Sequence, residues 1–429
     1  DLFRLNLFQP NPYRWRRFPR SLKRPGQSQR KAMSSTNLFR HQAYHSERPT
    51  SPYRLVAEPA SATPGSDEYF RRITEATKSF HERNVAAVFL VHGTFAGDDS
   101  FGLLTELERH VPRLAKHLQR TRKGVFDLFA QETGNYTRRF EREIERAVNQ
   151  QRNSKRTIPI RRFSWSGLNN HIARADGAVR LLVELAKHAE ENPAALDHPL
   201  PPRVQVWGHS HGGNVMALIA NLLAADEDMR QEFFTHSRRF CQSWLSRKIN
   251  LQSWHEAQKV LRNDKHPLRR LQIDYVTFGT PLRYAWPEEA NDRLVSFVNH
   301  RPKVTPLKQP GCDHLGPQKF RPWQLITGAA GDYVQQIGIA GSNIPAFPSV
   351  RAMLADWSLG RYLEAELKRE FLLSRIHHGR RVAESGTTLL IDYHDQGLAP
   401  WRHILGHGTY TRRRWLPFHC EEVSRTLYS

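Results

Sequence analysis

The sequence of 429 residues has few cysteines and no long apolar run. Cys241, Cys312 and Cys420 lie far apart, so we expect neither a disulfide framework nor a cysteine metal site. Free thiols are typical of reducing compartments, and we therefore expect a cytoplasmic protein without a metal or other cofactor. The most apolar stretch, Val85 to Val91, has seven residues, whereas a membrane-spanning helix needs about 20. The sequence therefore predicts no membrane span.

Acidic residues are also scarce, with 42 Asp and Glu against 64 Lys and Arg, which gives a net charge of +22. Such an excess is common in proteins that bind nucleic acid or phospholipid. Nine of the basic residues lie within residues 1–32, and the others are spread along the chain without a motif that reads bases. We therefore expect no specific nucleic-acid partner and leave peripheral association with anionic surfaces open. The oligomeric state is not indicated.

The N-terminal segment, residues 1–66, is rich in Pro, Ser and Arg and has too few apolar residues to bury a core. We expect it to be disordered. Because the first methionine is Met33, we interpret the residues before it as an upstream extension, with a basic targeting arm as the alternative. No apolar segment of the kind found in secretory signals follows its charges.

Apolar runs alternate with amphipathic stretches through residues 67–429, which we take as one domain. Continuous apolar runs are typical of parallel strands buried on both faces, and spacings of three and four indicate helices. The alternation predicts an α/β fold with a mostly parallel central sheet and helices on both faces. Residues 228–268 interrupt it with one or two amphipathic helices, which either pack on the core or cap a site. The predicted strands span 85–91, 158–165, 204–207, 273–278, 334–340 and 387–391, with helices at 172–185, 215–223 and 362–371.

The stretch Gly208–His–Ser–His–Gly–Gly213 matches the pattern G-x-S-x-G, with an apolar strand before it and an apolar-periodic helix after it. The glycines lack the Cβ atoms that would clash in so sharp a turn. A turn of this kind exposes its serine and directs the N-terminus of the helix at it, where the helix dipole favours developing negative charge. Ser210 is therefore the predicted nucleophile.

Together with Val91–His–Gly–Thr94, this motif resembles those of lipase- and esterase-like serine hydrolases with the α/β-hydrolase fold, over roughly residues 85–420. The resemblance implies an oxyanion hole built from the backbone N–H groups of His211 and Thr94, with Phe95 as the alternative to Thr94. It also implies that His92 braces the loop, because the general base of this fold comes late in the chain.

The general base is expected after the last predicted strand, where the candidates are His394, His403, His407 and His419. We choose His407, which two glycines flank, with His403 as the next candidate. The acid usually follows the penultimate strand, but no carboxylate follows 334–340 directly, where Gly341–Ser–Asn343 stands. We choose Asp392 at the end of the last strand; Asp395, or Asn343 in place of an acid, are the alternatives.

The tentative substrate pocket contains Phe95, His209, Trp165 and Ser166, which stand at the ends of predicted strands, where ligands bind in open α/β sheets. The expected function is hydrolysis of a carboxylic ester, lipid esters included, through an acyl-enzyme on Ser210. The alternative is a weakly active or inactive scaffold of the same fold that binds anionic partners.

Overall fold

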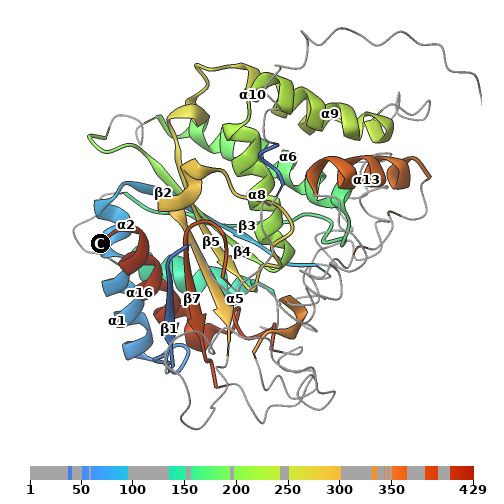
Figure 1. Ribbon diagram of the computed structural model, residues 1–429. Helices are drawn as coiled ribbons and strands as arrows, with labels where there is room; N and C mark the ends of the chain where they lie inside the picture. Colours follow the sequence, from blue (N-terminus) through green and yellow to red (C-terminus); the bar gives the residue numbers. More distant parts are fainter. Residues whose placement is uncertain are drawn as a thin grey trace, which may run out of the picture. The chain divides into compact units, whose positions relative to one another are not determined.

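A sheet of seven parallel strands forms the centre of the computed structural model, with the strand order β1-β7-β6-β5-β4-β2-β3 (Figure 1). This confirms the predicted α/β architecture. The strands are β1 (Tyr53–Val56), β2 (Val85–Val91), β3 (Ile160–Phe163), β4 (Arg203–His209), β5 (Gln272–Phe278), β6 (Leu294–Asn299) and β7 (Thr387–Ile391).

The structure describes residues 37–40, 51–57, 59–94, 135–150, 156–193, 198–241, 251–300, 331–335, 343, 346, 350–364, 382–394 and 406–429. From Leu38 onward they belong to one compact unit, Leu38–Ser429. Their helices are α1 (Asp67–Ala76), α2 (Lys78–Glu82), α5 (Arg138–Val148), α6 (His171–Glu191), α8 (His211–Ala224), α9 (Glu227–Cys241), α10 (Gln252–Arg262), α13 (Val350–Leu363) and α16 (Leu416–Leu427), with short 3-10 turns η3 (Pro267–Arg270), η4 (Glu288–Arg293) and η5 (Arg413–Trp415).

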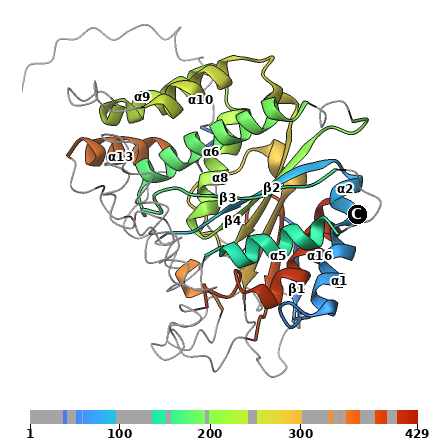
Figure 2. The ribbon, with the colours of Figure 1, turned by 180° about the vertical axis from the view of Figure 1, so that it is seen from behind.

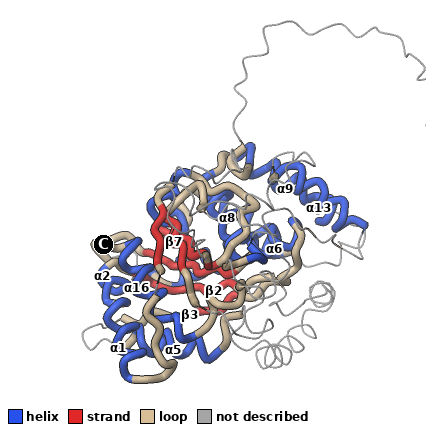
Figure 3. The backbone as a smooth tube through the Cα atoms, turned by 60° about the horizontal axis from the view of Figure 1, so that its bottom comes forward, coloured by secondary structure: helices blue, strands red, loops and turns tan. Residues whose placement is uncertain are grey.

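Helices cover both faces of the sheet (Figures 2 and 3). All seven residues of β2 are buried, and alternate side chains enter different cores. Phe89 and Val91 pack with α6 and α8, whereas Val88 and Leu90 pack with α1, α5 and α16. This two-sided burial explains why the run is apolar throughout.

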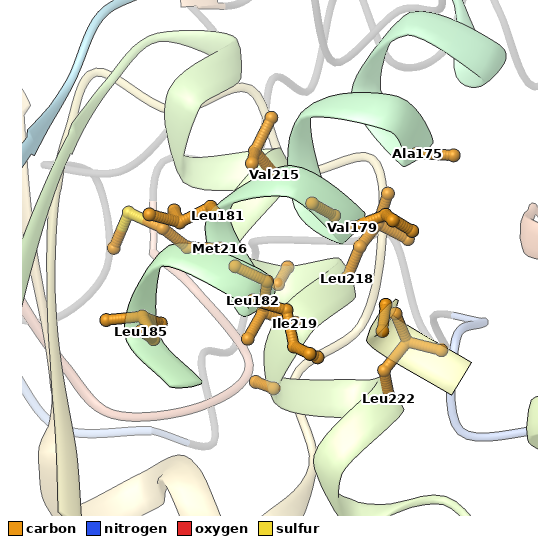
Figure 4. Packing of buried hydrophobic residues seen from close by; sticks show 14 of the residues in the cluster. Ala175, Val179, Leu181, Leu182, Leu185, Val215, Met216, Leu218, Ile219 and Leu222 are labelled. Carbon is orange, nitrogen blue, oxygen red and sulfur yellow. The ribbon is translucent and has the colours of Figure 1, made fainter. Parts of the chain in front are cut away.

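The first core is formed largely by α6 lying against α8 (Figure 4). Asn170 caps α6 by accepting a hydrogen bond from Ala173 N at 2.9 Å. The buried apolar residues that these two helices contribute to the core include Ala175, Val179, Leu181, Leu182 and Leu185 of α6 and Val215, Met216, Leu218, Ile219 and Leu222 of α8. Because Ser210 directly precedes α8 as its N-cap residue, this packing fixes the end of the helix next to the predicted nucleophile.

The predicted strand at 334–340 is wrong where the structure describes it, because Tyr333–Gln335 is helical and residues 336–340 lie outside the described residues. The strand between β5 and β7 is β6, which the sequence analysis missed. All six residues of β6 are buried, including the polar Ser296 and Asn299. Because these polar residues interrupt the apolar run, the sequence does not show that β6 is an interior strand.

The prediction that residues 1–66 are disordered is wrong for β1, which pairs in parallel with β7. Tyr53 and Leu55 remain exposed, so the strand is held at the sheet edge by its backbone hydrogen bonds to β7 and by the partly buried Val56, which packs on the core beside α1 and α16. Phe39 is also fully buried, against Phe233 of α9 and Tyr362 of α13. The low apolar content of residues 1–66 gave no sign that β1 and Phe39 are attached to the domain.

The helices predicted within 228–268 are present as α9 and α10. They bury Phe233, Trp254, Ala257 and Leu261 in the same core as α6 and α8. α9 packs on α13, and α10 packs on α6. The insertion therefore extends the helical layer, and its role as a cap remains a hypothesis. No helix among the described residues combines the length and apolarity needed to cross a membrane.

Candidate active site

Ser210 occupies the sharp turn between β4 and α8 that the motif predicts. Its backbone has φ 54° and ψ −131°, a region that non-glycine residues rarely adopt. Two hydrogen bonds hold the turn, from Ser210 N to Phe278 O at 2.8 Å and from Gly213 N to Ser210 O at 3.0 Å. Ser210 therefore stands at the N-terminus of a long buried helix, where negative charge is favoured.

The glycines around Ser210 allow the end of β2 to approach the turn closely. A Cβ atom on Gly93 would lie 2.7 Å from Ser210 Cβ, and one on Gly212 would lie 2.6 Å from Val91 O. Both distances are shorter than side chains tolerate, so any larger residue would push the two segments apart. The predicted oxyanion loop and the predicted nucleophile therefore lie directly against each other.

His92 holds the loop after β2. Its Nδ1–H donates to Gly93 O at 2.8 Å, and its Nε2 accepts from Trp165 N at 3.2 Å. Because a trans peptide points its N–H opposite to its C=O, the bond to Gly93 O also fixes the direction of the Thr94 N–H. His92 thus has the brace geometry that the resemblance implies.

The predicted oxyanion donors lie at the start of α8 and in the loop after β2. His211 is the first residue of α8, where backbone N–H groups have no partner within the helix. Thr94 follows the Gly93 that contacts Ser210. Phe95 lies outside the described residues.

His407 is brought to the turn from a distant part of the chain. Its ring centroid lies 4.6 Å from that of His209, the residue before Ser210, and His209 Nε2 donates to His407 O at 3.1 Å. His407 Nδ1 donates to Asp332 Oδ2 at 2.7 Å. His407 Nε2 is buried and has no hydrogen-bond partner among the residues that the structure describes. That nitrogen is consequently left for a proton-transfer partner.

Asp332 is the carboxylate that orients His407, and it is fully buried. Its Oδ2 also accepts from Tyr410 OH at 2.8 Å, and its Oδ1 accepts from Gln335 N at 2.8 Å. Burial alone would raise the pKa of Asp332, but the charge and hydrogen bond of His407, with the bonds from Gln335 and Tyr410, outweigh burial and lower that pKa. The carboxylate is therefore held ionised beside the imidazole.

The choice of Asp392 as the acid is wrong, because Asp332 occupies that position beside His407. Asp392 lies at the β7–β1 edge, where its Oδ1 accepts from His394 N at 3.1 Å and its N–H donates to Val56 O at 3.0 Å. Asn343 instead contacts Arg174 and Asp356. Asp395 lies outside the described residues.

The sequence held a usable signal for Asp332, since in the hydrolases that its motifs resemble the acid follows the penultimate strand. That strand is β6, and the Asp332 N–H donates to Asn299 O at its end at 2.9 Å. The signal was lost because β6 was not recognised and because residues 300–331 separate it from Asp332.

The other candidate bases are engaged elsewhere. His394 is exposed, and its Nε2–H donates to Ala57 O at 2.7 Å. His419 is fully buried against Tyr393 OH at 2.8 Å, and burial lowers its pKa to about 3. His403 lies outside the described residues.

Two of the predicted pocket residues, Trp165 and His209, support the turn and its neighbours. Trp165 stacks on His92 and donates from Nε1 to His92 O at 2.9 Å. His209 contacts His407, as described above. Ser166 is buried and its Oγ accepts from Leu168 N at 3.5 Å. Within the described residues, these contacts give Trp165 and His209 roles in positioning the histidines.

A buried polar network behind His211 was not predicted. Asn214 Nδ2 donates to His211 Nδ1 at 3.0 Å, and Asn214 Oδ1 accepts from Arg283 N at 3.2 Å. Burial, followed by the charges of Arg174 and Arg283, lowers the pKa of His211 far below its ordinary value. The His211 side chain is therefore neutral, so the positive end of α8 is not accompanied by an imidazolium ion.

Within the described residues, no group of three or more His, Cys, Asp or Glu could hold a metal ion. Comparison of the chain with protein-family models, with curated proteins and with solved structures found no match.

Proposed function

We propose that the protein is a serine hydrolase that cleaves carboxylic esters, lipid esters included, through an acyl-enzyme on Ser210. The observation that carries the proposal is the buried Asp332–His407 pair, whose imidazole ring lies 4.6 Å from that of His209, the residue before the strained Ser210 at the N-terminus of α8. A carboxylate, an imidazole and a serine in this order are the elements of a catalytic triad.

In the proposed reaction, Asp332 accepts the Nδ1–H of His407, so the Nε2 lone pair is free to take the Ser210 proton. Ser210 Oγ then attacks the ester carbonyl, and the negative charge moves to the carbonyl oxygen. The backbone N–H groups of His211 and Thr94 are the proposed donors to that oxygen. The protonated imidazole gives its proton to the leaving alkoxide, and the acyl group remains on Ser210.

Water completes the cycle. His407 takes a proton from a water molecule as that water attacks the acyl-enzyme, and returns the proton to Ser210 Oγ as the acid product leaves. The same acyl chemistry applies to thioesters and amides. We propose carboxylic esters because the Gly208–Gly213 and Val91–Thr94 segments resemble those of esterases and lipases.

The decisive test is Ser210→Ala, measured on p-nitrophenyl esters of several chain lengths. We expect kcat/KM to fall by at least about 10⁴-fold, because loss of the nucleophile removes covalent catalysis. Labelling by a fluorophosphonate should also disappear, while the circular-dichroism spectrum stays unchanged. Ser237→Ala, which removes a different buried hydroxyl on α9, is the matched control and should keep both turnover and labelling. Unchanged turnover or labelling in Ser210→Ala refutes the proposal.

The alternative of an inactive scaffold rested on the missing carboxylate near Gly341–Asn343. Asp332 supplies a buried carboxylate to His407, which removes the reason for preferring that alternative. We keep a cytoplasmic location as part of the proposal, because the cysteines are scattered along the sequence and Cys420 is a free, buried thiol.

A further inference from the structure

Helix α13 has apolar side chains on two opposite faces. One face packs on α9 and α6 through Ala355, Leu359 and Leu363, all of which are fully buried (Figures 1 and 2). The other face is open to solvent, with Val350 69% exposed, Met353 39%, Leu354 41% and Trp357 60%. These four residues follow the spacing i, i+3, i+4, i+7, so they form one continuous strip along the helix. We call this strip the α13 face.

The α13 face is unusual in this molecule. Seven large hydrophobic residues are exposed among those the structure describes, and four of them belong to this single helix. Tyr53 and Leu55 of the edge strand β1, and Leu200, are the other three. Scattered apolar residues are normal on a protein surface, but a contiguous group marks an interaction site.

The charged side chain that contacts the α13 face is an arginine. Arg361 is exposed, and its guanidinium lies 5.0 Å from the centre of the Trp357 ring. Asp356, the acidic residue of the helix, is buried and accepts hydrogen bonds from Ile172 N and Asn343. The chain as a whole carries a net charge of +22. The surface that fits this face is therefore apolar inside and anionic outside.

A lipid surface fits these features better than a second copy of the chain. A stable dimer buries about 800 Å² on each partner, more than four partly exposed side chains supply. Two copies would also bring like charges together, because the exposed charge beside the strip is an arginine. Tryptophan and arginine next to apolar residues are instead typical of helices that lie at a membrane interface.

The α13 face is connected to the candidate active site through the C-terminal end of the helix. Glu364 accepts a hydrogen bond from Arg283 Nε, the Arg283 N–H donates to Asn214, and Asn214 donates to His211. His211 directly follows Ser210. A helix seated on lipid would thus be tied to the residue that carries a proposed oxyanion donor.

We propose that the α13 face docks the protein on an anionic lipid surface. Lipid binding itself does not depend on catalysis, whereas its use in presenting lipid esters rests on the proposed function. Arg361 faces the headgroups, and the apolar strip enters the boundary between headgroups and acyl chains.

The test is co-sedimentation of the full chain with vesicles of phosphatidylcholine and phosphatidylglycerol, against vesicles of phosphatidylcholine alone. We expect binding to the mixed vesicles that weakens as NaCl is raised. The double variant Leu354→Ser/Trp357→Ser should lose at least about tenfold in partition coefficient, because buried apolar area drives such binding. Leu200→Ser is the matched control, since Leu200 is 39% exposed and lies outside α13, and it should bind as the unaltered protein does.

Hydrolysis of a water-soluble p-nitrophenyl ester and the circular-dichroism spectrum should be the same in the double variant, which separates docking from folding and chemistry. Ser210→Ala should retain vesicle binding, so failure of the proposed function leaves this result unaffected. Three outcomes overturn the docking proposal: no binding of the unaltered protein to anionic vesicles, equal binding of the double variant, or a dimer in sedimentation that the double variant abolishes.

Discussion

Asp332 Oδ2 accepts hydrogen bonds from two different side chains, His407 and Tyr410. Tyr410 OH is itself fixed, because it accepts from Asn299 N at 2.8 Å at the end of β6. The carboxylate is therefore positioned from the sheet on one side and from the C-terminal segment on the other. Because the fixed carboxylate accepts a hydrogen bond from His407 Nδ1, it favours the imidazole tautomer in which Nδ1 carries the proton.

Asp332→Asn should lower kcat/KM for p-nitrophenyl esters by about 10³- to 10⁴-fold, because an amide can neither fix that tautomer nor stabilise the imidazolium ion. The chain offers a matched control in Asp392→Asn, which changes the same group at the β7–β1 edge. That variant should remain within a few-fold of the unaltered protein. Equal losses in the two variants would show that Asp332 has no special role.

Helix α8 and strand β2 meet at a spacing that only a glycine permits. A Cβ atom on Gly212 would lie 2.6 Å from Val91 O and 2.8 Å from His92 O. The first turn of α8 thus rests on the backbone of the loop that leads to Thr94. The position of the whole helix relative to the predicted oxyanion loop therefore depends on Gly212 having no side chain.

Gly212→Ala should therefore push α8 away from the end of β2, with a loss of about 1–3 kcal/mol in the free energy of unfolding, as in other overpacked sites. Ester hydrolysis should fall as well, because the two proposed oxyanion donors move apart. Urea unfolding followed by circular dichroism measures the first effect. Gly65→Ala is the control, since its Cβ would meet nothing within 4 Å and it tests only the cost of a positive φ. Equal stability of the two variants would contradict the close-approach argument.

Several histidines are buried as neutral groups throughout the molecule. Burial, as the largest cause, lowers the pKa of His171 to about 3, of His188 to about 4 and of His419 to about 3. It also lowers the pKa of His211 far below its ordinary value. In the unfolded chain these groups would titrate near 6.5. Between 6.5 and the folded values, the unfolded state binds protons that the folded state excludes.

The whole protein should therefore lose stability as the pH falls from about 7 to 5, before most carboxylates titrate. Each such histidine contributes a slope of up to about 1.4 kcal/mol per pH unit below its unfolded pKa. The urea midpoint measured at pH 7, 6 and 5 checks this, and His419→Gln should flatten the dependence by up to one proton. A midpoint that does not change over this range would mean that these histidines are accessible to protons in the folded state.

The features that the sequence determined by itself are local. The apolar run of β2 and the spacing in α6 and α8 identify buried elements, because burial selects side chains at every position or every turn. The turn at Ser210 is recognisable for the same reason: its backbone torsions and close contacts require glycines within a few residues. The sequence also singled out His407, by its place after the last predicted strand and between two glycines, and the structure brings it beside His209.

Which distant residues and strands lie beside one another was decided only by the tertiary structure. Asp332 and His407 are 75 residues apart, and nothing local to either residue distinguishes Asp332 from Asp392. β6 was missed because Ser296 and Asn299 find partners only inside the folded sheet, and β1 because its hydrogen bonds lie on β7. A hydrogen bond between distant residues leaves no periodic trace in a sequence, since each partner needs only to be polar and correctly placed.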